Sequence, residues 1–331
     1  MLLGERPCRV DQGRGSSFNS VSRCNSRPVW RESIVALRLA EEERRSYIDE
    51  GFFVREAVFG EADIERLRAA AERVVGSAAR ASMEVLQLDA GAPRSPAESL
   101  KNYRIDGNRY VEAAQSTVQF EHGSDSETIR VIEPFHHLDP VFDGLVEDPR
   151  IVTPICGVLG LDRVALWTDK INLKRPFEGS GFRWHQDSPY WSHACGHCDQ
   201  LPNVMITLDD ADRENGCFRL IPGSHRKGFL PGLSDGSQLG PLFTDPACFD
   251  ESAEWLAEVP AGSVIVFDAH IVHGSEPNLS ERSRRAIVLT YQPADHPMFK
   301  TSGIRNFSID SVEDAMTSAA ESDHAVAAGN R

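Results

Sequence analysis

The chain of 331 residues lacks an uninterrupted apolar segment of about 18 or more residues, so we predict that it does not span a membrane. No apolar signal region follows Met1, and the seven cysteines are scattered and odd in number, which disfavours a secreted disulfide scaffold. Basic residues are also scarce: 35 Lys and Arg face 50 Asp and Glu, and the net charge of −15 repels nucleic-acid phosphates. These absences favour a cytoplasmic protein that acts on small molecules.

The two ends of the chain differ in composition from the rest. Residues 1–33 are rich in Arg and Ser and have no periodic apolar pattern, which predicts a disordered arm or an extension from a misplaced start codon. An organelle transit segment is a less favoured interpretation. Residues 311–331, rich in Ala, Ser and acidic groups, are expected to form a flexible tail. Residues 34–310 then form one domain, expected as a monomer or homodimer.

Helical patterns come first in this domain, and strand patterns follow. Residues 41–59 predict a helix, a glycine stop and a short strand, and residues 61–75 predict a helix with one apolar face. A further helix is expected within 139–159, whereas the polar segment 80–128 gives no clear pattern. After residue 160, short strand patterns are separated by Gly, Pro, Asn and Asp, as in a β-sandwich or barrel. The expected fold is mainly β (α+β), with N-terminal helices packed on a β core.

His185 and Asp187 lie two residues apart in the segment FRWHQDSPYW. Side chains alternate along a strand, so residues two apart point to the same face and can reach one metal ion. His273, at the end of another strand pattern, can supply a third ligand. Two histidines and one carboxylate on one face are typical ligands of non-haem Fe(II), which keeps its other positions open. His270, three residues earlier, is the rival for the third position.

Polar side chains on two other strand patterns can surround such a site. Arg284 follows the last of these histidines by eleven residues, and an arginine there can bind the far end of a dicarboxylic acid. Alternation places Arg284 and Arg285 on opposite faces without deciding which face is inside. In WTDKINLK, Thr168, Lys170 and Asn172 share one face and offer polar groups to a carboxylate or to metal-bound water.

Other candidate residues have simpler interpretations. The segment HACGHC at 193–198 contains a C-x-x-C pair that could bind zinc or undergo redox chemistry, but no second pair stands at zinc-ribbon spacing. A loop or lid over the metal site is favoured. We expect Trp184 and Tyr190 to line the pocket, with core packing as the alternative. His136 and His137 are interpreted as packing or capping residues.

Three segments together, residues 169–191, 206–225 and 272–292, resemble the phytanoyl-CoA dioxygenase family of Fe(II)- and 2-oxoglutarate-dependent oxygenases. Residues 41–59 are similar to the usual opening of that family, and the resemblance covers roughly residues 38–300. The spacing around the metal motif is similar to that of ectoine hydroxylases. The resemblance implies a double-stranded β-helix core of the jelly-roll or cupin type.

The resemblance also implies a role for each matching residue. These are the iron ligands His185, Asp187 and His273; the 2-oxoglutarate contacts Arg284, Asn172 and Thr168; and the substrate contacts Trp191, Tyr190 and Trp184. The C5 carboxylate of 2-oxoglutarate is assigned to Arg284 rather than Arg285. Thr168 replaces a glutamine of the ectoine enzymes, and Pro189 and Tyr190 replace their Glu-Thr, so ectoine is not the expected substrate.

By this resemblance, Fe(II), 2-oxoglutarate and O₂ together hydroxylate an unactivated C–H bond of a small-molecule metabolite, as in secondary metabolism, and succinate and CO₂ are released. Related halogenases have a small residue in place of Asp187, so hydroxylation or another oxidation such as desaturation is favoured over halogenation. Two alternatives stay open. One is a hydroxylase of acyl-CoA or carrier-bound substrates of the phytanoyl-CoA type, and the other is a non-catalytic β-helix binding module. No nucleic-acid or membrane partner is expected.

Overall fold

The computed structural model describes residues 37–89, 101–123 and 126–309. The arm and the tail that the sequence predicts at the two ends lie outside these ranges, so the division into arm, domain and tail stays a prediction. None of the helices in the described ranges is both long enough and apolar enough to cross a membrane.

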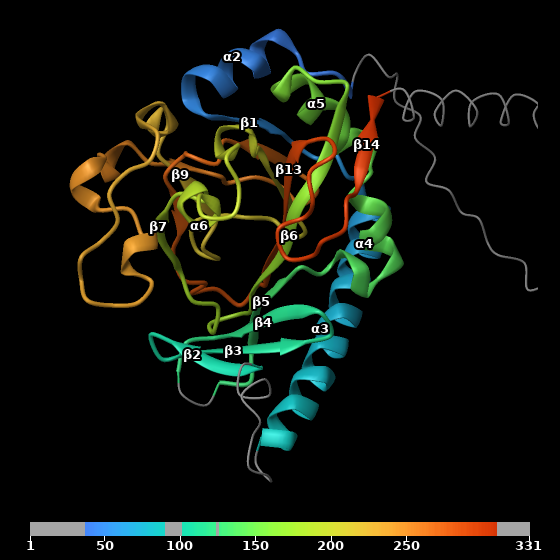
Figure 1. The fold of residues 1–331 in the computed structure, drawn as a ribbon, viewed down its shortest axis with the longest axis vertical. Helices are drawn as coiled ribbons and strands as arrows, with labels where there is room; N and C mark the ends of the chain where they lie inside the picture. Colours follow the sequence, from blue (N-terminus) through green and yellow to red (C-terminus); the bar gives the residue numbers. More distant parts are fainter. Residues whose placement is uncertain (1–36, 90–100, 124–125, 310–331) are drawn as a thin grey trace, which may run out of the picture. The chain divides into compact units, whose positions relative to one another are not determined.

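Two antiparallel sheets form the core of the described chain (Figure 1). The larger sheet contains, in spatial order, β1 (Phe52–Arg55), β11 (Val264–Phe267), β8 (Asn203–Thr207), β13 (Arg284–Pro293), β6 (Arg163–Lys174), β5 (Ile129–Glu133), β4 (Ser116–Phe120), β3 (Asn108–Ala113) and β2 (Asn102–Ile105), with β14 (Asn306–Ser308) also paired to β6. The smaller sheet contains β10 (Trp255–Leu256), β9 (Phe218–Leu220), β12 (His273–Ser275) and β7 (Phe182–His185).

The chain crosses between the two sheets repeatedly from β6 onward. It runs from β6 to β7, β8 and β9, and then from β10 to β11, β12 and β13. Every step changes sheet except the one from β9 to β10, which both belong to the smaller sheet. This alternation is the winding of a double-stranded β-helix, which confirms the predicted core. It also means that the facing ends of β7 and β12 are brought together by the winding rather than by nearness in sequence.

The helices precede or interrupt this winding. They are α2 (Glu41–Glu50), α3 (Glu61–Asp89), α4 (Pro140–Leu145), α5 (Pro149–Leu159) and the single turn α6 (Ser188–Trp191), with short 3-10 turns such as η1 (His136–Leu138) and η2 (Cys198–Gln200). The predicted glycine stop of α2 is confirmed: Gly51 has φ 88° and its N–H donates to Tyr47 O at 3.1 Å. A Cβ at Gly51 would lie 2.5 Å from His225 Nδ1, so the close approach also requires glycine.

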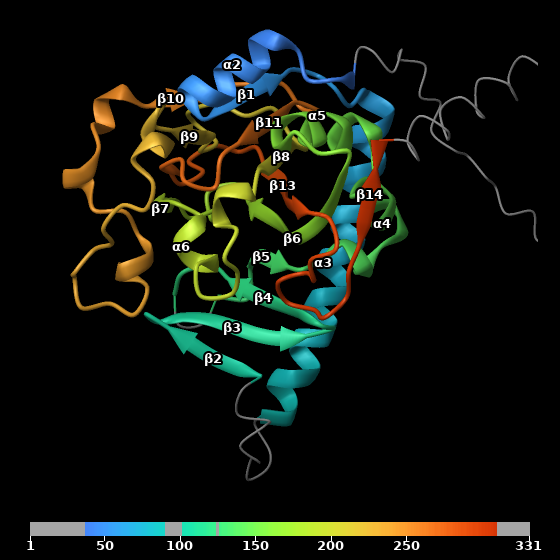
Figure 2. The same cartoon turned by 45° about the horizontal axis from the view of Figure 1, so that its top comes forward.

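Residues of β13 alternate between two separate apolar cores. Ile287 and Leu289 pack with the apolar face of α3, which includes the buried Leu67. Ala286 and Val288 point the other way, between the two sheets. Figure 2 shows α3 running beside the larger sheet, which it covers on the outer side. The helical layer therefore stabilises one face of this sheet and leaves the other face for the site.

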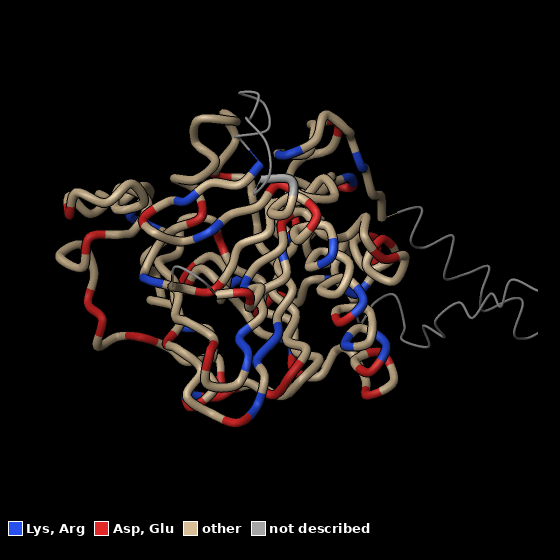
Figure 3. Tube along the Cα trace, turned by 90° about the horizontal axis from the view of Figure 1, so that it is seen from below, with Lys and Arg blue, Asp and Glu red and all other residues tan. Residues whose placement is uncertain are grey.

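The polar segment at 80–128 contains structure that the sequence did not predict. α3 continues to Asp89, and β2, β3 and β4 follow as an antiparallel extension of the larger sheet. Every residue of β2 is half-buried or exposed, so this edge strand has no apolar alternation to reveal it. Acidic and basic residues are interspersed along the described trace (Figure 3), so the net negative charge is not confined to one segment.

Candidate metal centre and its cavity

Three metal-binding side chains meet where β7 ends and β12 begins. His185 is the last residue of β7, His273 is the first of β12, and the two lie opposite each other in the antiparallel pair. Asp187 follows two residues after His185, and its backbone N–H donates to Ala269 O at 3.0 Å. The Nε2 atoms of His185 and His273 lie 3.9 and 3.7 Å from oxygens of the Asp187 carboxylate. In the described part of the chain, this is the only such group of three or more His, Cys, Asp or Glu side chains.

Backbone carbonyls orient both imidazole rings. His185 Nδ1 lies 2.7 Å from Arg183 O, and His273 Nδ1 lies 3.0 Å from Ile271 O. A carbonyl oxygen only accepts, so each Nδ1 carries the proton and each Nε2 directs its lone pair toward the common site. Burial, together with the charge of His273, lowers the pKa of His185 to about 3, and burial also lowers the pKa of His273. Both rings are therefore neutral at neutral pH, as metal ligands must be.

The carboxylate of Asp187 fits a bound cation. Its Oδ2 atom is buried and has no hydrogen-bond partner among the described residues, and its Oδ1 atom lies 3.5 Å from Lys170 Nζ. Burial alone would raise the pKa of Asp187, but Lys170 and the two histidines bring it below its usual value, so the group is ionised. An unpaired buried carboxylate oxygen is costly. Two neutral imidazoles and one carboxylate fit Fe(II), and they leave open positions for other ligands.

The other histidines considered from the sequence are bound elsewhere. His270 Nδ1 lies 2.7 Å from Ser188 Oγ, and its Nε2 lies 2.7 Å from Asp199 Oδ1, so neither nitrogen faces the group of three. His136 Nδ1 lies 2.7 Å from Asp169 Oδ2, and the backbone N–H of His136 donates to the same carboxylate. His136 is thus a buried, hydrogen-bonded residue, as its interpretation as a packing residue predicts, and it caps no described helix.

The HACGHC segment forms a loop beside the cavity. Cys195 Sγ and Cys198 Sγ lie 3.6 Å apart, but no third described metal-binding side chain joins them. The backbone N–H of Cys195 donates to Trp191 O at 3.2 Å, and Cys198 packs against Trp191 and Trp167. The segment therefore packs against Trp191. The described residues give no basis for a structural zinc site there.

The metal-binding group opens into a cavity of about 840 Å³ between the two sheets. Of the residues predicted around the metal, Asn172, Arg284, Tyr190 and Trp191 line this cavity. Asn172 Oδ1 is buried and has no hydrogen-bond partner among the described residues, so its amide is available to a bound molecule. A volume of this size suits a small-molecule site, which typically has about 300 to 1,000 Å³.

Arg284 is a buried cation on the cavity side of β13. Its Nε and Nη2 atoms donate to Gly216 O at 3.1 and 2.6 Å, and it forms no ion pair with a described carboxylate. Lys174, its partner across the strands in β6, donates to the same carbonyl and to Glu276 O. Burial and the charge of Arg284 lower the pKa of Lys174 to about 5, and burial lowers that of Arg284 to about 10. The guanidinium of Arg284 is therefore oriented by the backbone carbonyl of Gly216 and can bind an anion in the cavity.

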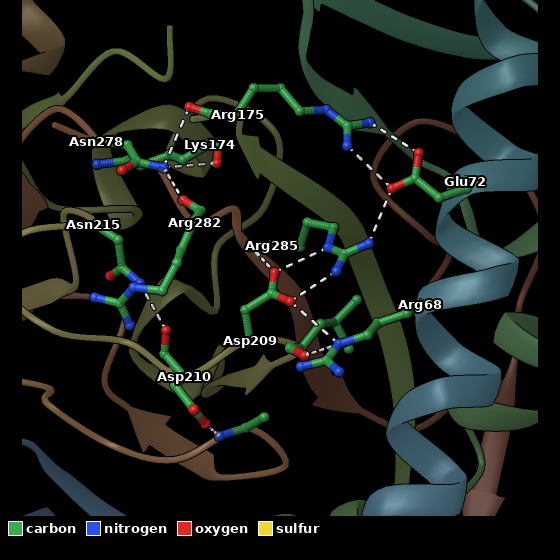
Figure 4. Close-up of polar contacts among 12 residues, drawn as sticks. Arg68, Glu72, Lys174, Arg175, Asp209, Asp210, Asn215, Asn278, Arg282 and Arg285 are labelled. Carbon is green, nitrogen blue, oxygen red and sulfur yellow. Dashed lines mark hydrogen bonds and ion pairs between the residues drawn. The ribbon is translucent and has the colours of Figure 1, made fainter. Parts of the chain in front are cut away.

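Arg285 faces the opposite side of the sheet. Figure 4 shows its guanidinium between Asp209 and Glu72, at 2.7 and 3.0 Å. Arg175, which follows β6, pairs with the same Glu72 carboxylate at 3.1 Å. The ambiguity that strand alternation left open is therefore resolved, because Arg284 lies in the cavity and Arg285 binds α3.

Two predicted contacts lie outside the cavity. Thr168 is buried and donates to Glu133 Oε1 at 2.9 Å, so it reaches the cavity only through Glu133, which does line it. Trp184 lies on the other face of β7, because it precedes His185 and strand side chains alternate. Its ring N–H donates to Glu251 Oε1 at 3.0 Å, and Arg219 lies over its ring. The assignments of direct co-substrate contact to Thr168 and of substrate contact to Trp184 are corrected accordingly.

The cavity also contains polar residues that the sequence predictions did not include. Ser275 lines it two residues after His273, which the strand period alone could have indicated. Arg130 and Tyr110 line it from β5 and β3. Lys170, in contrast, was predicted to share a polar face with Asn172, and it also lines the cavity.

Comparisons with known proteins agree with this geometry. Residues 47–286 match the family described as phytanoyl-CoA dioxygenase (PhyH). The chain belongs to the phytanoyl-CoA dioxygenase family. It is therefore an Fe(II)- and 2-oxoglutarate-dependent dioxygenase, which confirms the predicted enzyme class, cofactors and fold.

Named relatives have related activities on different small molecules. The chain is similar to "L-proline trans-4-hydroxylase" of Streptomyces griseoviridis, with 31% identity over 191 residues that cover 53% of this chain and 70% of that protein. It is also similar to "Ectoine dioxygenase" of Bordetella parapertussis, with 26% identity over 291 residues, 82% of this chain and 80% of the relative. The solved structure of EctD from S. alaskensis with 2-oxoglutarate and 5-hydroxyectoine has a TM-score of 0.55 and 21% identity, covering 78% of each chain, and thus shares the fold.

Proposed function

We propose that this dioxygenase hydroxylates an unactivated C–H bond of a small-molecule metabolite, with secondary metabolism as the expected context. One oxygen atom of O₂ enters the substrate as a hydroxyl group. The other enters succinate, which forms from 2-oxoglutarate with loss of CO₂. The observation that carries the proposal is the convergence of His185, Asp187 and His273 beside the buried, unneutralised guanidinium of Arg284.

Each side chain has a role that follows from its position. His185 and His273 would hold Fe(II) through Nε2, and Asp187 would hold it through its unpartnered oxygen. Bound Fe(II) supplies open positions at which 2-oxoglutarate and O₂ react. Arg284 would bind the distal carboxylate of 2-oxoglutarate, and the Asn172 amide would hydrogen-bond to the same molecule.

The remaining cavity residues would shape the substrate site. Tyr190 and Trp191 follow directly after the metal-binding turn and line the cavity, so we assign them to substrate contact. The presence of Asp187 favours hydroxylation, because a carboxylate occupies the ligand position that halide would need. The cavity volume supports a small metabolite over an acyl-CoA or carrier-bound substrate. Cytoplasmic location and a monomeric or homodimeric state stay predictions.

The proposal is tested by substrate-triggered succinate release. Purified protein with Fe(II), 2-oxoglutarate and O₂ is incubated with single members of a metabolite library, and succinate and hydroxylated product are measured together. We expect one class of compounds to yield both in equal amounts. Metal-dependent 2-oxoglutarate binding is measured separately under nitrogen. A chain that fails to bind 2-oxoglutarate in a metal-dependent way would contradict the proposal and favour the binding-module alternative.

A further inference from the structure

Five Lys and Arg side chains line the cavity, and three of them are already paired with carboxylates. The pairs are Lys170 with Asp187 at 3.5 Å, Lys300 with Glu133 at 3.3 Å, and Arg183 with Asp235 at 3.3 Å. Arg130 and Arg284 are the other two. Neither has a carboxylate oxygen within ion-pair distance in the described part of the chain. The cavity therefore holds two guanidinium groups whose charge is not neutralised by an adjacent carboxylate.

Arg130 is held rigidly at the cavity wall. Its guanidinium lies 4.0 Å from the centre of the Phe182 ring, and Nη2 donates to Gly181 O at 2.7 Å. Nη1 contacts His122 Nε2, and Nε is buried without a hydrogen-bond partner among the described residues. A stacked, oriented guanidinium with one unused N–H is ready to bind an oxyanion.

Glu121 does not form an ion pair with Arg130. Its Oε2 accepts hydrogen bonds from the backbone and hydroxyl of Ser180, and its charge only partly offsets the burial that lowers the pKa of Arg130. Two tyrosines, Tyr110 and Tyr190, line the cavity with Arg130, and their phenol groups are hydrogen-bond donors. Burial raises the pKa of Tyr110, so this hydroxyl stays protonated and can donate to an anion.

The proposed function assigns only one of the two free guanidiniums. 2-Oxoglutarate has two carboxylates, of which one accompanies its keto group at the metal and the other would bind Arg284. No anionic group of the co-substrate is then left for Arg130. An unpaired cation in a buried cavity is costly, and an anionic ligand offsets that cost.

We propose that Arg130 binds an anionic group, a carboxylate or a phosphonate, of the primary substrate and so selects acidic metabolites. This inference rests on the proposed function, because it takes the second guanidinium, Arg284, to be occupied by 2-oxoglutarate. Tyr110 and Tyr190 complete the site with hydroxyl donors. Neutral analogues would leave Arg130 unpaired and are therefore excluded.

The test uses minimal anions on the loaded protein. The protein with Mn(II) and saturating 2-oxoglutarate is titrated by calorimetry with propionate, with methylphosphonate and with the neutral propionamide. We expect at least one anion to bind and propionamide not to bind, and the anion that binds more tightly identifies the substrate's acidic group. Arg130→Met should weaken that binding by about tenfold or more, as expected for loss of a charge-assisted hydrogen bond. Arg130→Lys, which keeps the charge, should weaken it less.

Arg219→Met is the matched control. Arg219 also lies over an aromatic ring, that of Trp184 at 4.4 Å, but it is neutralised by Glu254 and Glu276 and does not line the cavity. Its replacement should leave anion binding unchanged. Far-UV circular dichroism establishes that each variant is folded, and Arg130→Lys provides the measurement if Arg130→Met does not fold.

Separate results distinguish failure of this inference from failure of the proposed function. If the wild-type protein binds 2-oxoglutarate but neither anion, or if Arg130→Met binds the anion as the wild type does, the inference is wrong and the proposed function stands. If Arg130→Met instead weakens 2-oxoglutarate binding more than tenfold, Arg130 is a co-substrate residue and the inference is also wrong. Loss of metal-dependent 2-oxoglutarate binding in the wild type overturns the proposed function itself.

Discussion

On β13 and at the end of β6, neighbouring basic residues face opposite ways. Lys174 and Arg284 point inward, where in the described structure they donate only to backbone carbonyl oxygens, and of the two only Arg284 lines the cavity. Arg175 and Arg285 point outward and share the carboxylate of Glu72 on α3. The outward pair is neutralised by this carboxylate, whereas the inward pair has no carboxylate partner among the described residues, and burial leaves only Arg284 of the inward pair charged at neutral pH. Of two basic residues adjacent in sequence, one thus forms an ion pair with α3 and the other has no carboxylate partner among the described residues.

The comparison separates stability from function. On the outer face, charge neutralisation and apolar packing attach the helical layer to the sheet. On the inner face, the uncompensated guanidinium of Arg284 and the unpartnered carboxylate oxygen of Asp187 lower the stability of the fold and raise the affinity for an anion and a metal. Substitutions on the inner face should therefore change mainly the affinity for ligands, and substitutions on the outer face should change mainly the free energy of unfolding.

The largest expected effect is on the inner face. Asp187→Ala removes the only anionic metal ligand, so we expect loss of Fe(II) binding and of succinate release. Anaerobic metal titration measures the affinity. His270→Ala is the control, because His270 bonds Ser188 and Asp199 instead of facing the metal site. If His270→Ala lost the metal and Asp187→Ala kept it, the ligand assignment would be wrong.

Identical truncations on the two faces should differ in stability. Val266 is fully buried under the helices, and Val288 lines the cavity. Val266→Ala should lower the free energy of unfolding by about 2 to 3 kcal/mol, and Val288→Ala by about half as much, since the cavity already borders its side chain. Urea denaturation of both variants measures the difference. Equal losses would show that the cavity side is packed as tightly as the helical side.

The neighbouring arginines sharpen the comparison further. Arg284→Met should raise the dissociation constant of 2-oxoglutarate by about tenfold or more, because a charge-assisted contact is lost. Arg285→Met should change that constant little and instead lower stability, because Asp209 and Glu72 lose their partner. Calorimetric titration with Mn(II) present measures both variants. Similar dissociation constants for the two variants would show that Arg284 has no special role in binding 2-oxoglutarate, and a larger rise in Arg285→Met would assign that role to Arg285.

The last effect is a dependence of stability on pH. Burial lowers the pKa of Lys174 to about 5 in the folded chain, whereas an unfolded lysine has a pKa of about 10.4. Between these values the unfolded state binds more protons, so this residue makes stability rise with pH, by up to about 1.4 kcal/mol per unit. Lys174→Met should reduce the rise in the free energy of unfolding between pH 6 and 9, as measured by urea denaturation. Arg175→Met should leave this rise unchanged. An unchanged slope in Lys174→Met would show that Lys174 stays charged in the folded protein.

Much of the fold and the metal-binding group could be predicted because both depend on local periodicity. The helical period of α3 buries Leu67 as predicted. The spacing of His185 and Asp187 indicated a shared site, although β7 ends at His185 and Asp187 lies in the turn that begins α6. The family pattern then selects His273 over His270. Such signals are contained in short segments, so they do not depend on which distant part of the chain a segment contacts.

Contacts that depend on which strand lies next to another in the sheet could not be predicted from local periodicity. Thr168 shares a strand face with Asn172, yet Glu133 of the neighbouring strand lies between it and the cavity. Trp184 is an aromatic residue of the kind that often lines a pocket. It directly precedes His185 in β7, however, so its side chain lies on the opposite face of the strand, away from the cavity. Arg130 was missed because β5 and the strands before it lack a clear apolar alternation, and its importance depends on carboxylates that fail to reach it.

The pairing of His185 with His273 across two hydrogen-bonded strands has a consequence for metal selection. Their ring centres lie 4.1 Å apart, and the antiparallel pairing of β7 with β12 places the two residues opposite each other. A set of two imidazoles and one carboxylate follows the general affinity order of the first-row divalent ions, in which cobalt, nickel and copper exceed iron. Occupancy by iron is then decided by the ions that the surroundings supply, and competing ions should act as inhibitors without disturbing the fold.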